Sequence, residues 1–577
     1  MENLKIAQIF REMADILELM GENRFRYLAY RRAAQTIEHS SQEMRQIADE
    51  NPKKLLDLSG VGQGLADKII EILHSGDCRE HQMLLAGFKT GLLELLTVRG
   101  LGPKKVKKFY TELGIDSLPK LKHAAETGLL AKLPGMGEKS QTSVIQSIKD
   151  HEKHSQRLIL HAATEMANRL VVYLKTCPVV DRVEYAGSCR RKQETVGDID
   201  ILVTGKTEKD HGRIVAHFVT QPDVQQILAH GETKASVILE SANGPIQSDL
   251  RVVDESSFGA ALHYFTGSKA HNIAMRKFAI SKGFKLNEYG LFKGEKRMAG
   301  KTEESLFKAL GLPYIIPELR RDEGEIDAAL NNTLPHSIEL SDIQGDLHMH
   351  TRESDGGNTL EEMVAAAQAL GYRYIGITEH SSSLRVASGL DEARLIDHLR
   401  HIDSLNKKLK NFRILKSAEV DILEDGSLDY PNGILKKLDF VNISVHTKMN
   451  LPSEQQTARV LKAMSNPYVS VLCHPTGRIV NDREPYPIDL IEIARAAKKY
   501  RVALEISSSF RLDLNEGNCR LTHAEGAKFV INTDSHRTDS LKFMQFGVGM
   551  ARRGWLEKKD ILNTLPVEKL LAYFRKK

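Results

Sequence analysis

Residues 345–350 read GDLHMH, a strand-length apolar run that ends on two histidines, and six comparable runs follow it. The later runs are YIGITEH (374–380), LKSAEV (415–420), FVNISVH (440–446), VSVLCHP (469–475), VALEISSS (502–509) and FVINTDSH (529–536). Roughly 20 to 35 residues with helical periodicity separate each run from the next, an alternation typical of parallel β/α folds. This pattern predicts a barrel of parallel strands whose carboxyl ends meet at one mouth.

Six of the seven runs close on side chains that bind metals. The candidate ligands are His348, His350, Asp355, His380, Glu419, His446, His474, Asp534 and His536. Nitrogen and oxygen donors without a thiolate suit two or three Zn²⁺, Mn²⁺ or Fe²⁺ ions rather than a closed structural zinc site. Clustered metals activate water and hold both oxygens of a phosphoryl transfer, so the set predicts phosphoester hydrolysis. The alternative is a scatter of surface or core histidines, and their recurrence at strand ends argues against it.

The motifs HMH, TEH, SVH, CHP and TDSH resemble those of the polymerase and histidinol phosphatase (PHP) domain. The resemblance spans about residues 341–577. It implies a seven-stranded distorted barrel, (βα)7, with a trinuclear metal centre and, usually, nuclease or phosphatase activity. The donor types do not distinguish Mn²⁺, Zn²⁺ and Fe²⁺.

Composition sets the frame for the rest of the chain. The sequence has 577 residues, enough for three to five domains. Lys and Arg together number 81 against 76 Asp and Glu, and the resulting charge of +5 is compatible with nucleic acid without demonstrating it. Five widely spaced cysteines without a CxxC pattern indicate a reducing cytoplasm. Because no apolar run approaches the roughly 18 residues of a membrane span, we expect a soluble protein that is not exported.

Three Gly-x-Gly elements interrupt the helical periodicity of the first 150 residues. They read LSGVGQGLADKI (58–69), VRGLGPKKVKKF (98–109) and LPGMGEKSQTSV (133–144). Glycine permits a tight turn that leaves N–H groups free at a helix N-terminus, where a DNA phosphate is favoured. The elements resemble the helix-hairpin-helix motif of repair enzymes, with an ordinary helix turn as the alternative for each copy. The predicted DNA contacts are Gly60, Gly62, Gly100, Gly102, Gly135 and Gly137.

A second metal site is predicted in GSCRRKQETVGDIDILV (187–203). Asp198 and Asp200 alternate with isoleucines, so on a strand both carboxylates project from one face, about 7 Å apart. Asp249, in the alternating stretch IQSDLRVV, supplies a third carboxylate for a two-metal site. The alternative is an ordinary exposed strand face.

These carboxylates lie between a polar turn and a long motif-bearing segment. The turn, Gly187-Ser188 with Arg190-Arg191, is suited to a triphosphate, and residues 262–292 read LHYFTGSKAHNIAMRKFAISKGFKLNEYGLF. Together these motifs resemble the X family of DNA polymerases, relatives of polymerase beta, over residues 1–317. An X-family polymerase joined to a PHP domain is the bacterial and archaeal form.

The resemblance implies a role for each matching residue. Asp198, Asp200 and Asp249 would bind two Mg²⁺ or Mn²⁺ ions, with Asp249 nearest the primer 3′-hydroxyl. The expected nucleotide contacts are Ser188, Arg191 and Gly197 for the triphosphate, Tyr264, Phe265 and Gly267 for the sugar, and Asn272 and Arg276 for the nascent base pair. For the Tyr-Phe pair, core packing is the alternative.

The first 90 residues resemble the lyase domain of that family. Lys68 aligns with the lysine that attacks an abasic sugar as a Schiff-base nucleophile, and Arg26 and Tyr30 align with 5′-phosphate contacts. A second lysine of the family pattern is replaced by Gly64. Two roles for Lys68 therefore stay open, catalysis of the lyase step or binding of the 5′-phosphate.

The predicted organisation has six segments. They are a lyase-like helical domain (1–90), a helix-hairpin-helix region (91–154), a nucleotidyltransferase palm (155–254), a thumb (255–317), a polar linker (318–340) and a PHP phosphoesterase (341–577). The predicted function is a DNA-directed DNA polymerase that fills short gaps in base excision repair. A metal-dependent 3′-5′ exonuclease accompanies it, with abasic-site endonuclease or 3′-phosphatase action as further candidates.

The expected partners are gapped or nicked DNA and dNTPs, with no membrane, and the protein is expected to be a monomer. Two alternatives from other classes are a DNA-end scaffold with one vestigial site and a small-molecule phosphatase such as histidinol phosphatase. The second explains only the C-terminal third of the chain.

Overall fold

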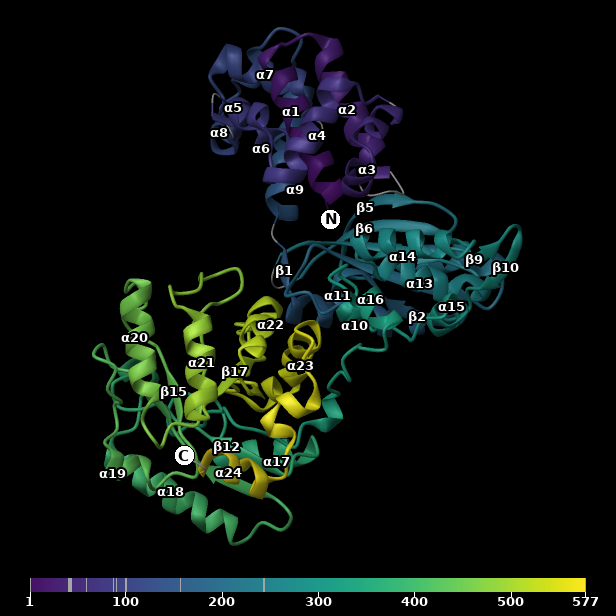
Figure 1. Ribbon diagram of the computed structural model, residues 1–577. Coiled ribbons are helices and arrows are strands. Elements are labelled where there is room, and N and C mark those ends of the chain that lie inside the picture. Colours follow the sequence, from purple (N-terminus) through teal and green to yellow (C-terminus); the bar gives the residue numbers. More distant parts are fainter. Residues whose placement is uncertain are drawn as a thin grey trace.

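The computed structural model describes residues 2–39, 44–58, 60–86, 88–89, 91–98, 101–155, 157–241 and 244–575. Figure 1 shows three parts in chain order: helices at the N-terminal end, a sheet flanked by helices in the middle, and a larger β/α body that ends the chain. The predicted fold class, helical domains followed by palm, thumb and a PHP barrel, is confirmed.

The N-terminal part contains two helical domains with separate cores. The first consists of α1 (Glu2–Met20), α2 (Arg24–His39), α3 (Met44–Glu50), α4 (Gln63–Ser75) and α5 (Arg79–Ala86). Its core includes Phe10, Met13, Tyr30 and Ile69. The second consists of α6 (Gly91–Thr97), α7 (Pro103–Leu113), α8 (Leu118–Glu126) and α9 (Glu138–Ser155). Leu19, near the end of α1, belongs to the second core, so α1 joins the two domains.

Helix α7 shows why the hairpin sequences fold as they do. Gly102 is extended and caps the helix, Pro103 occupies the first turn, and Gly114 ends the helix with a φ of +66°. Proline is favoured in the first turn because its missing N–H has no helical acceptor there, and glycine is favoured where the chain turns left-handed. Val106 and Phe109, three residues apart, are the buried face.

The palm is a five-stranded sheet in the order β2-β4-β7-β6-β5. Its strands are β2 (Val180–Tyr185), β4 (Asp198–Gly205), β7 (Ile246–Val252), β6 (Lys234–Leu239) and β5 (Val224–His230). The central pair β4 and β7 is parallel, and the other pairs are antiparallel. The helices α10 (Leu160–Lys175) and α12 (His211–Val219) cover one face of the sheet.

Strand β4 has two different faces, as its alternating sequence predicts. Ile199 and Ile201 pack in the core that contains α10 and α12. Leu202 packs on the opposite side against α13 (Phe258–Thr266), so Asp198 and Asp200 project from this second face. The carboxylates therefore lie on the side of the sheet that the thumb flanks.

The thumb follows with α13, α14 (Lys269–Ser281), a meander of β8 (Lys285–Asn287), β9 (Gly290–Lys293) and β10 (Lys296–Ala299), and α15 (Glu303–Leu310). Residues 318–340, expected to be a polar linker, connect the thumb to the barrel. They do not form a free linker, because they pack against the thumb. Arg320 is fully buried and pairs with Glu303 at 2.5 Å, and Glu325 of α16 (Glu325–Leu330) pairs with His271 at 2.6 Å. Because a buried ion is stable only when paired and a buried polar group only when hydrogen-bonded, these contacts tie the connecting stretch to the thumb.

The C-terminal body is a closed (βα)7 barrel. Its strands are β11 (Gly345–Asp346), β12 (Tyr374–Ile377), β13 (Arg413–Lys416), β14 (Glu419–Asp421), β15 (Asn442–Ser444), β16 (Val471–Leu472), β17 (Ala503–Ser507) and β18 (Phe529–Asn532), all parallel. The strands form two sheets, β11-β12-β13 and β14-β15-β16-β17-β18. Parallel bridges between Met349 and Ser535 and between His380 and Glu419 join these sheets into a barrel. The predicted run 415–420 is divided between β13 and β14, with a break at residues 417–418.

Helices alternate with the strands around the barrel. They are α17 (Leu360–Ala369), α18 (Glu392–Asn406), α19 (Asn432–Leu435), α20 (Ser453–Met464), α21 (Leu490–Tyr500), α22 (Glu516–Ala524) and α23 (Met544–Arg553). Tyr374, Phe440 and Val530 share a core with the final helix α24 (Val567–Arg575), which closes one end of the barrel. Their strand neighbours, such as Ile375 and Val441, pack in the core shared with the surrounding helices. The alternation of strand side chains thus gives the barrel an inner and an outer core.

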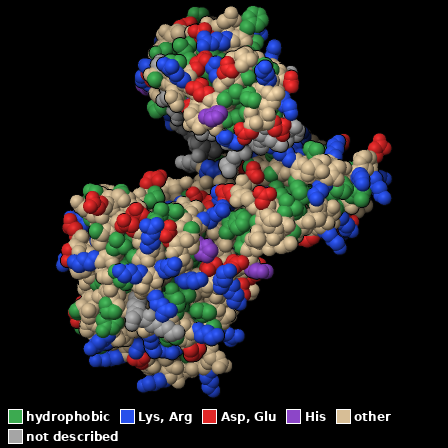
Figure 2. Space-filling model, viewed as in Figure 1, with side chains coloured by type: hydrophobic (Ala, Val, Ile, Leu, Met, Phe, Trp, Pro, Cys, Tyr) green, Lys and Arg blue, Asp and Glu red, His purple; other side chains and the backbone are tan. Residues whose placement is uncertain are grey.

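The surface mixes charges of both signs. On the face shown in Figure 2, Lys and Arg side chains are interspersed with Asp and Glu over all three parts of the molecule. Among the residues that the structure describes, no helix combines the length and apolarity needed to cross a bilayer.

Candidate metal centres and nucleotide site

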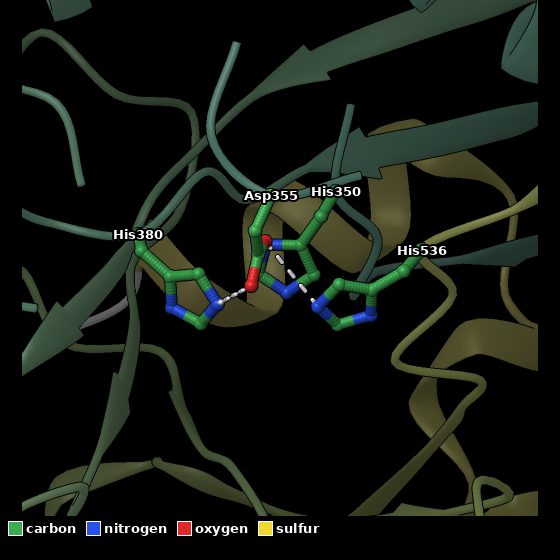
Figure 3. A group of neighbouring side chains, drawn as sticks. All are labelled: His350, Asp355, His380 and His536. Carbon is green, nitrogen blue, oxygen red and sulfur yellow. Dashed lines mark ion pairs between the residues drawn. The ribbon is translucent and has the colours of Figure 1, made fainter. Parts of the chain in front are cut away.

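The ligands predicted from the barrel sequence converge at one mouth of the barrel. His350, Asp355, His380 and His536 form one group of donor atoms that lie within 4.8 Å of one another. Figure 3 shows these four side chains pointing toward a common centre, with Asp355 between the imidazoles of His380 and His536. His348 and Asp534 join His350 in a second group.

Glu419 lies at the centre of the remaining ligands. Its Oε1 is 2.9 Å from Nε2 of His474 and 3.5 Å from Nε2 of His446, and its Oε2 is 2.9 Å from Nδ1 of His380. Asp534 Oδ1 lies 3.4 Å from His350 Nε2 and 3.5 Å from His348 Nε2. All nine predicted ligands therefore meet in one cluster, with two carboxylates placed to bridge metals.

Buried atoms without hydrogen-bond partners show that the cluster fits metal ions. They include His348 Nε2 and both ring nitrogens of His350. Buried polar atoms are normally satisfied, and a cation at the centre would satisfy these. Despite burial, which raises it, the pKa of Glu419 is held well below its ordinary value by His446, His348 and His380. The carboxylate is therefore ionised and ready to bind a cation.

Residues that the sequence analysis missed orient the ligands. Glu505 accepts a hydrogen bond from Nδ1 of His348 at 2.7 Å, which directs Nε2 of that ring to the centre. Asp421 lies 2.9 Å from Nδ1 of His446 in the same way. Such partners fix the tautomer and the ring direction of metal-binding histidines. A lone carboxylate inside an otherwise apolar strand, as in VALEISSS, is the sequence signal that indicates this role.

Cys473 also approaches the cluster, near His348 and Glu419. Burial raises the pKa of its thiol well above the ordinary value, and its side chain belongs to the inner apolar core of the barrel. Cys473 therefore packs in this core at the edge of the ligand cluster.

The palm carboxylates form a second candidate metal centre. Asp200 lies directly opposite Asp249 on the parallel strands β4 and β7, and donor oxygens of Asp198, Asp200 and Asp249 lie within 4.8 Å of one another. Ser236 and Gln247 donate hydrogen bonds to the two oxygens of Asp249, the second at 2.9 Å. Burial, Asp198 and Asp249 raise the pKa of Asp200 to about 7. Mutual repulsion of this kind is relieved when divalent cations bind.

The turn before β4 is built to approach these carboxylates. Gly187 has a φ of +62°, and a β-carbon there would lie 2.1 Å from Oδ2 of Asp200. Only glycine allows this conformation and this contact. The short helix α11 (Gly187–Arg190) that follows places Ser188 and Arg191 beside the carboxylates.

Comparison with known proteins identifies both halves of the chain. Sequence profiles match a helix-hairpin-helix domain (residues 1–78), a SAM-like helix-hairpin-helix tandem (92–150), a DNA polymerase beta thumb (261–321) and a PHP domain (346–513). The chain is 35% identical over 580 residues to the DNA polymerase/3′-5′ exonuclease PolX of Bacillus subtilis (strain 168), with 100% of both chains covered. The chain belongs to the bacterial PolX group of X-family DNA polymerases.

Two further likenesses cover parts of this PolX-family enzyme. A probable phosphatase of Thermoanaerobacter sp. (strain X514) is 31% identical over 244 residues, which is 40% of the present chain and 94% of that protein. The solved ternary primer/template complex of Leishmania infantum polymerase beta is similar to 40% of the chain and 99% of its own length, at 24% identity and a TM-score of 0.34.

In this PolX-family chain, the predicted nucleotide contacts other than Gly197 line one cavity of about 690 Å³. They are Ser188, Arg191, Tyr264, Phe265, Gly267, Asn272 and Arg276, together with Asp198 and Asp200. Tyr264 and Phe265 are partly exposed and line the cavity, and Phe265 also packs against the small core formed by Leu202, Phe258 and Leu262. Gly197 lies against Arg157, whose Nη1 would be 2.8 Å from a β-carbon there.

Three cavity residues were missed by the sequence analysis: Arg157, Gln193 and Lys269. Arg157 donates hydrogen bonds to the side chain and carbonyl of Thr195 at 2.9 and 2.8 Å, which holds its guanidinium near the carboxylates. Single charged residues outside any motif give no signal of this placement.

In the N-terminal domain, the three lyase-related residues meet at a carboxylate that the sequence analysis missed. Glu80 pairs with Lys68 at 2.9 Å and with Arg26 at 2.8 Å, and it accepts a hydrogen bond from Tyr30 at 3.0 Å. Although burial raises it, the pKa of Glu80 is lowered by the hydrogen bonds from Lys68 and Arg26. Glu80 therefore places a negative charge at the centre of this cationic site, and Lys68 pairs with it.

The hairpin glycines lie where helices begin. Gly62 and Gly102 cap α4 and α7, Gly137 precedes α9, and a β-carbon at any of them would meet nothing within 4 Å. Gly60 and Gly135 have φ values of +80° and +75°. Gly100 lies outside the described residues. The open backbone at these helix starts is suited to phosphate approach.

Proposed function

We propose that the protein fills short gaps in damaged DNA with its palm site and processes 3′ ends with its barrel site. The observation that carries the proposal is the presence of two separate ligand sets in one chain, a carboxylate triad and a histidine-rich cluster. The first suits Mg²⁺ or Mn²⁺, and the second suits Mn²⁺, Zn²⁺ or Fe²⁺.

In the palm, Asp198, Asp200 and Asp249 would hold two cations. Divalent cations there lower the pKa of the primer 3′-hydroxyl and stabilise the pyrophosphate leaving group. Asp249 is held in place by hydrogen bonds from Ser236 and Gln247, and it would hold the cation nearest the primer 3′-hydroxyl. Arg191, which lines the same cavity beside these carboxylates, would provide a planar cation for the triphosphate.

In the barrel, the nine ligands would hold two or three cations. Cations bound there activate water and neutralise the phosphate during phosphodiester hydrolysis. Arg511 lies beside this centre, 3.5 Å from Asp534, and its Nη1 is buried without a hydrogen-bond partner. We assign this guanidinium to the phosphate of the terminal nucleotide. The likeness to the DNA polymerase/3′-5′ exonuclease PolX supports removal of 3′ nucleotides as the activity of this centre.

A second candidate activity for the barrel is 3′-phosphatase or abasic-site hydrolysis. The likeness of 40% of the chain to a probable phosphatase favours it. A terminal phosphate monoester and a terminal phosphodiester present the same oxygens to the metals, so one centre can serve both.

For the N-terminal domain we propose 5′-phosphate binding as the role of Lys68, Arg26 and Tyr30. A Schiff-base nucleophile has to be a neutral amine, and Lys68 instead forms an ion pair with Glu80. The same three residues provide the cations and hydroxyl that a phosphate needs. The gap would thus be recognised at its 5′ side by this domain.

The proposed partners are gapped or nicked DNA and dNTPs, bound by a monomer in the cytoplasm. Five free, buried cysteines support a reducing compartment. The hairpin glycines support contact with DNA phosphates.

The test uses a one-nucleotide gapped duplex with a labelled primer and Mn²⁺, with and without dNTPs. Extension with dNTPs and shortening without them are expected. Asp249→Ala should abolish extension and spare shortening, and His350→Ala should do the reverse. Asp254→Ala and His401→Ala, both at exposed positions, are matched controls that should change neither activity.

Each alternative predicts a different result. Extension alone would reduce the barrel to a support, and shortening alone would make the palm a vestigial site. Loss of both activities in either variant, with the fold retained, would contradict the model of two independent centres.

A further inference from the structure

Residues 187–194 of the palm, called the triphosphate turn here, are held by arginines of the barrel. Arg553, at the end of α23, is 3% exposed, and its Nη1 donates a hydrogen bond to the carbonyl oxygen of Arg191 at 2.8 Å. Its Nη2 pairs with Glu516 at 2.6 Å. A few residues along the same turn, Glu194 pairs with Arg478 at 2.6 Å. The turn is therefore anchored at two points to the other catalytic domain.

The acceptor carbonyl lies where a short helix ends. Helix α11 has four residues, and Arg191 is its C-cap. The last carbonyls of a helix have no partners within it, and a cationic side chain near them satisfies them and interacts favourably with the helix dipole. In this palm the cation comes from α23, more than 350 residues away in the chain.

The Arg191 side chain is confined at the same time. Its Nη1 donates to the carbonyl of Thr266, and it lines the nucleotide cavity. Burial and the nearby Arg553 lower the pKa of Arg191 to about 10. The two guanidiniums would repel each other without Glu516, which pairs with Arg553 at 2.6 Å and with Arg321 at 2.5 Å. Glu516 thus lets Arg553 stay next to Arg191.

Close packing leaves the turn little freedom to move. The β-carbon of a residue at position 549 in α23 would lie 2.9 Å from the Cβ of Lys192, so Gly549 allows the helix to approach the turn. Lys192 itself has a φ of +54°. Displacing α23 would therefore displace the backbone that carries Arg191.

We propose that Arg553 is a positioning residue of the polymerase site, although it belongs to the barrel: it fixes the backbone of Arg191 so that the guanidinium meets the dNTP triphosphate. The proposal rests on the polymerase function proposed above. It makes the barrel a structural part of the nucleotide site, independently of hydrolysis by the barrel.

The experiment compares full-length wild type, Arg553→Met and Arg553→Lys in single-nucleotide gap filling with Mg²⁺. A hydrogen bond from a charged group contributes enough that its loss should raise the KM for dNTP by about 10- to 100-fold. The kcat should change far less, and lysine should restore part of the loss because its ammonium group can still donate a charged hydrogen bond. Arg495→Met, which removes an exposed arginine paired with Glu525, should leave KM unchanged.

Shortening of a labelled 3′ end is measured on the same preparations and should be unaffected in Arg553→Met. An unchanged KM for dNTP in Arg553→Met would overturn the proposal. Glu194→Gln weakens the second anchor from the palm side. If Arg553→Met loses extension and shortening equally, and Glu194→Gln leaves the KM for dNTP unchanged, the proposal is overturned as well. If Glu194→Gln raises KM with shortening intact, the anchoring role stands. A wild type that adds no nucleotide would instead refute the polymerase function, and this inference with it.

Discussion

The palm carboxylates should release a proton when Mg²⁺ binds, by an amount that the pKa of Asp200 determines. Burial, Asp198 and Asp249 raise that pKa to about 7, so Asp200 carries about half a proton at pH 7 in the metal-free site. A cation binds the ionised carboxylate and therefore displaces this proton. The release should be about 0.9 proton at pH 6, about 0.5 at pH 7 and about 0.1 at pH 8.

The same protonation weakens Mg²⁺ binding in a defined pH range. Below pH 7 the cation competes with the proton, and above pH 8 the competition ends. The affinity should therefore fall about tenfold between pH 8 and pH 6 and stay level at higher pH.

The assay follows proton uptake or release with an indicator dye in weak buffer as Mg²⁺ is added to wild type and to Asp200→Asn. Histidine-rich centres prefer transition metals, and the subtraction of the variant removes any remaining contribution of the barrel. Asp254→Asn, at an exposed position, serves as the control and should match wild type. A difference near zero between wild type and Asp200→Asn at pH 6 would show that Asp200 is already ionised, and the reasoning from burial and repulsion would fail.

Three further results are expected. Glu80→Gln should tighten binding to gapped DNA by about two- to fivefold when the gap carries a 5′-phosphate, because it removes a partly exposed carboxylate that competes with the phosphate for Lys68. Equal effects with and without the 5′-phosphate would refute this prediction. Burial lowers the pKa of His161 to about 4, against about 6.5 in the unfolded chain, so the contribution of His161 to stability is full above pH 6.5 and falls by about 3 kcal/mol as the pH drops to 4. His161→Gln can still donate a hydrogen bond to the Ser508 carbonyl, so its free energy of unfolding in urea should fall by about 3 kcal/mol less than that of wild type over this pH range. Equal losses in the two proteins would contradict this prediction. Chelation should lower the melting temperature of wild type by several degrees and that of His350→Ala by less, as binding stabilises the folded state; equal shifts would refute a metal centre at His350.

Sequence alone predicted the parts of both centres that depend on strand periodicity. The two-residue spacing of Asp198 and Asp200 fixes them on one face of a strand. Their pairing with Asp249 follows once β4 and β7 are neighbours, which the motif resemblance implied. The barrel ligands were predictable for a similar reason, because the carboxyl ends of parallel strands meet at one mouth.

The supporting residues were not predictable, because they are defined by tertiary contacts. Glu80 reaches Lys68 from another helix, and nothing in its surrounding sequence distinguishes it from a surface carboxylate. Glu505 stands inside the one run that was not expected to close on a ligand. Arg553 acts on Arg191 only because α23 packs against the palm. A sequence motif contains residues that are close together in the chain. These contacts instead join residues that are far apart in the chain and lie in no common motif.

The two centres are held in ways that predict different exchange of their metals. The barrel ligands come from successive strands of a closed sheet, and Glu419 alone contacts His380, His446 and His474, so release of a cation would leave several buried atoms unsatisfied at once. The palm triad comes from two adjacent strands and is partly exposed. When a cation leaves the palm, the only cost is that the three carboxylates repel one another more strongly. We therefore expect cations at the palm to exchange faster than those in the barrel.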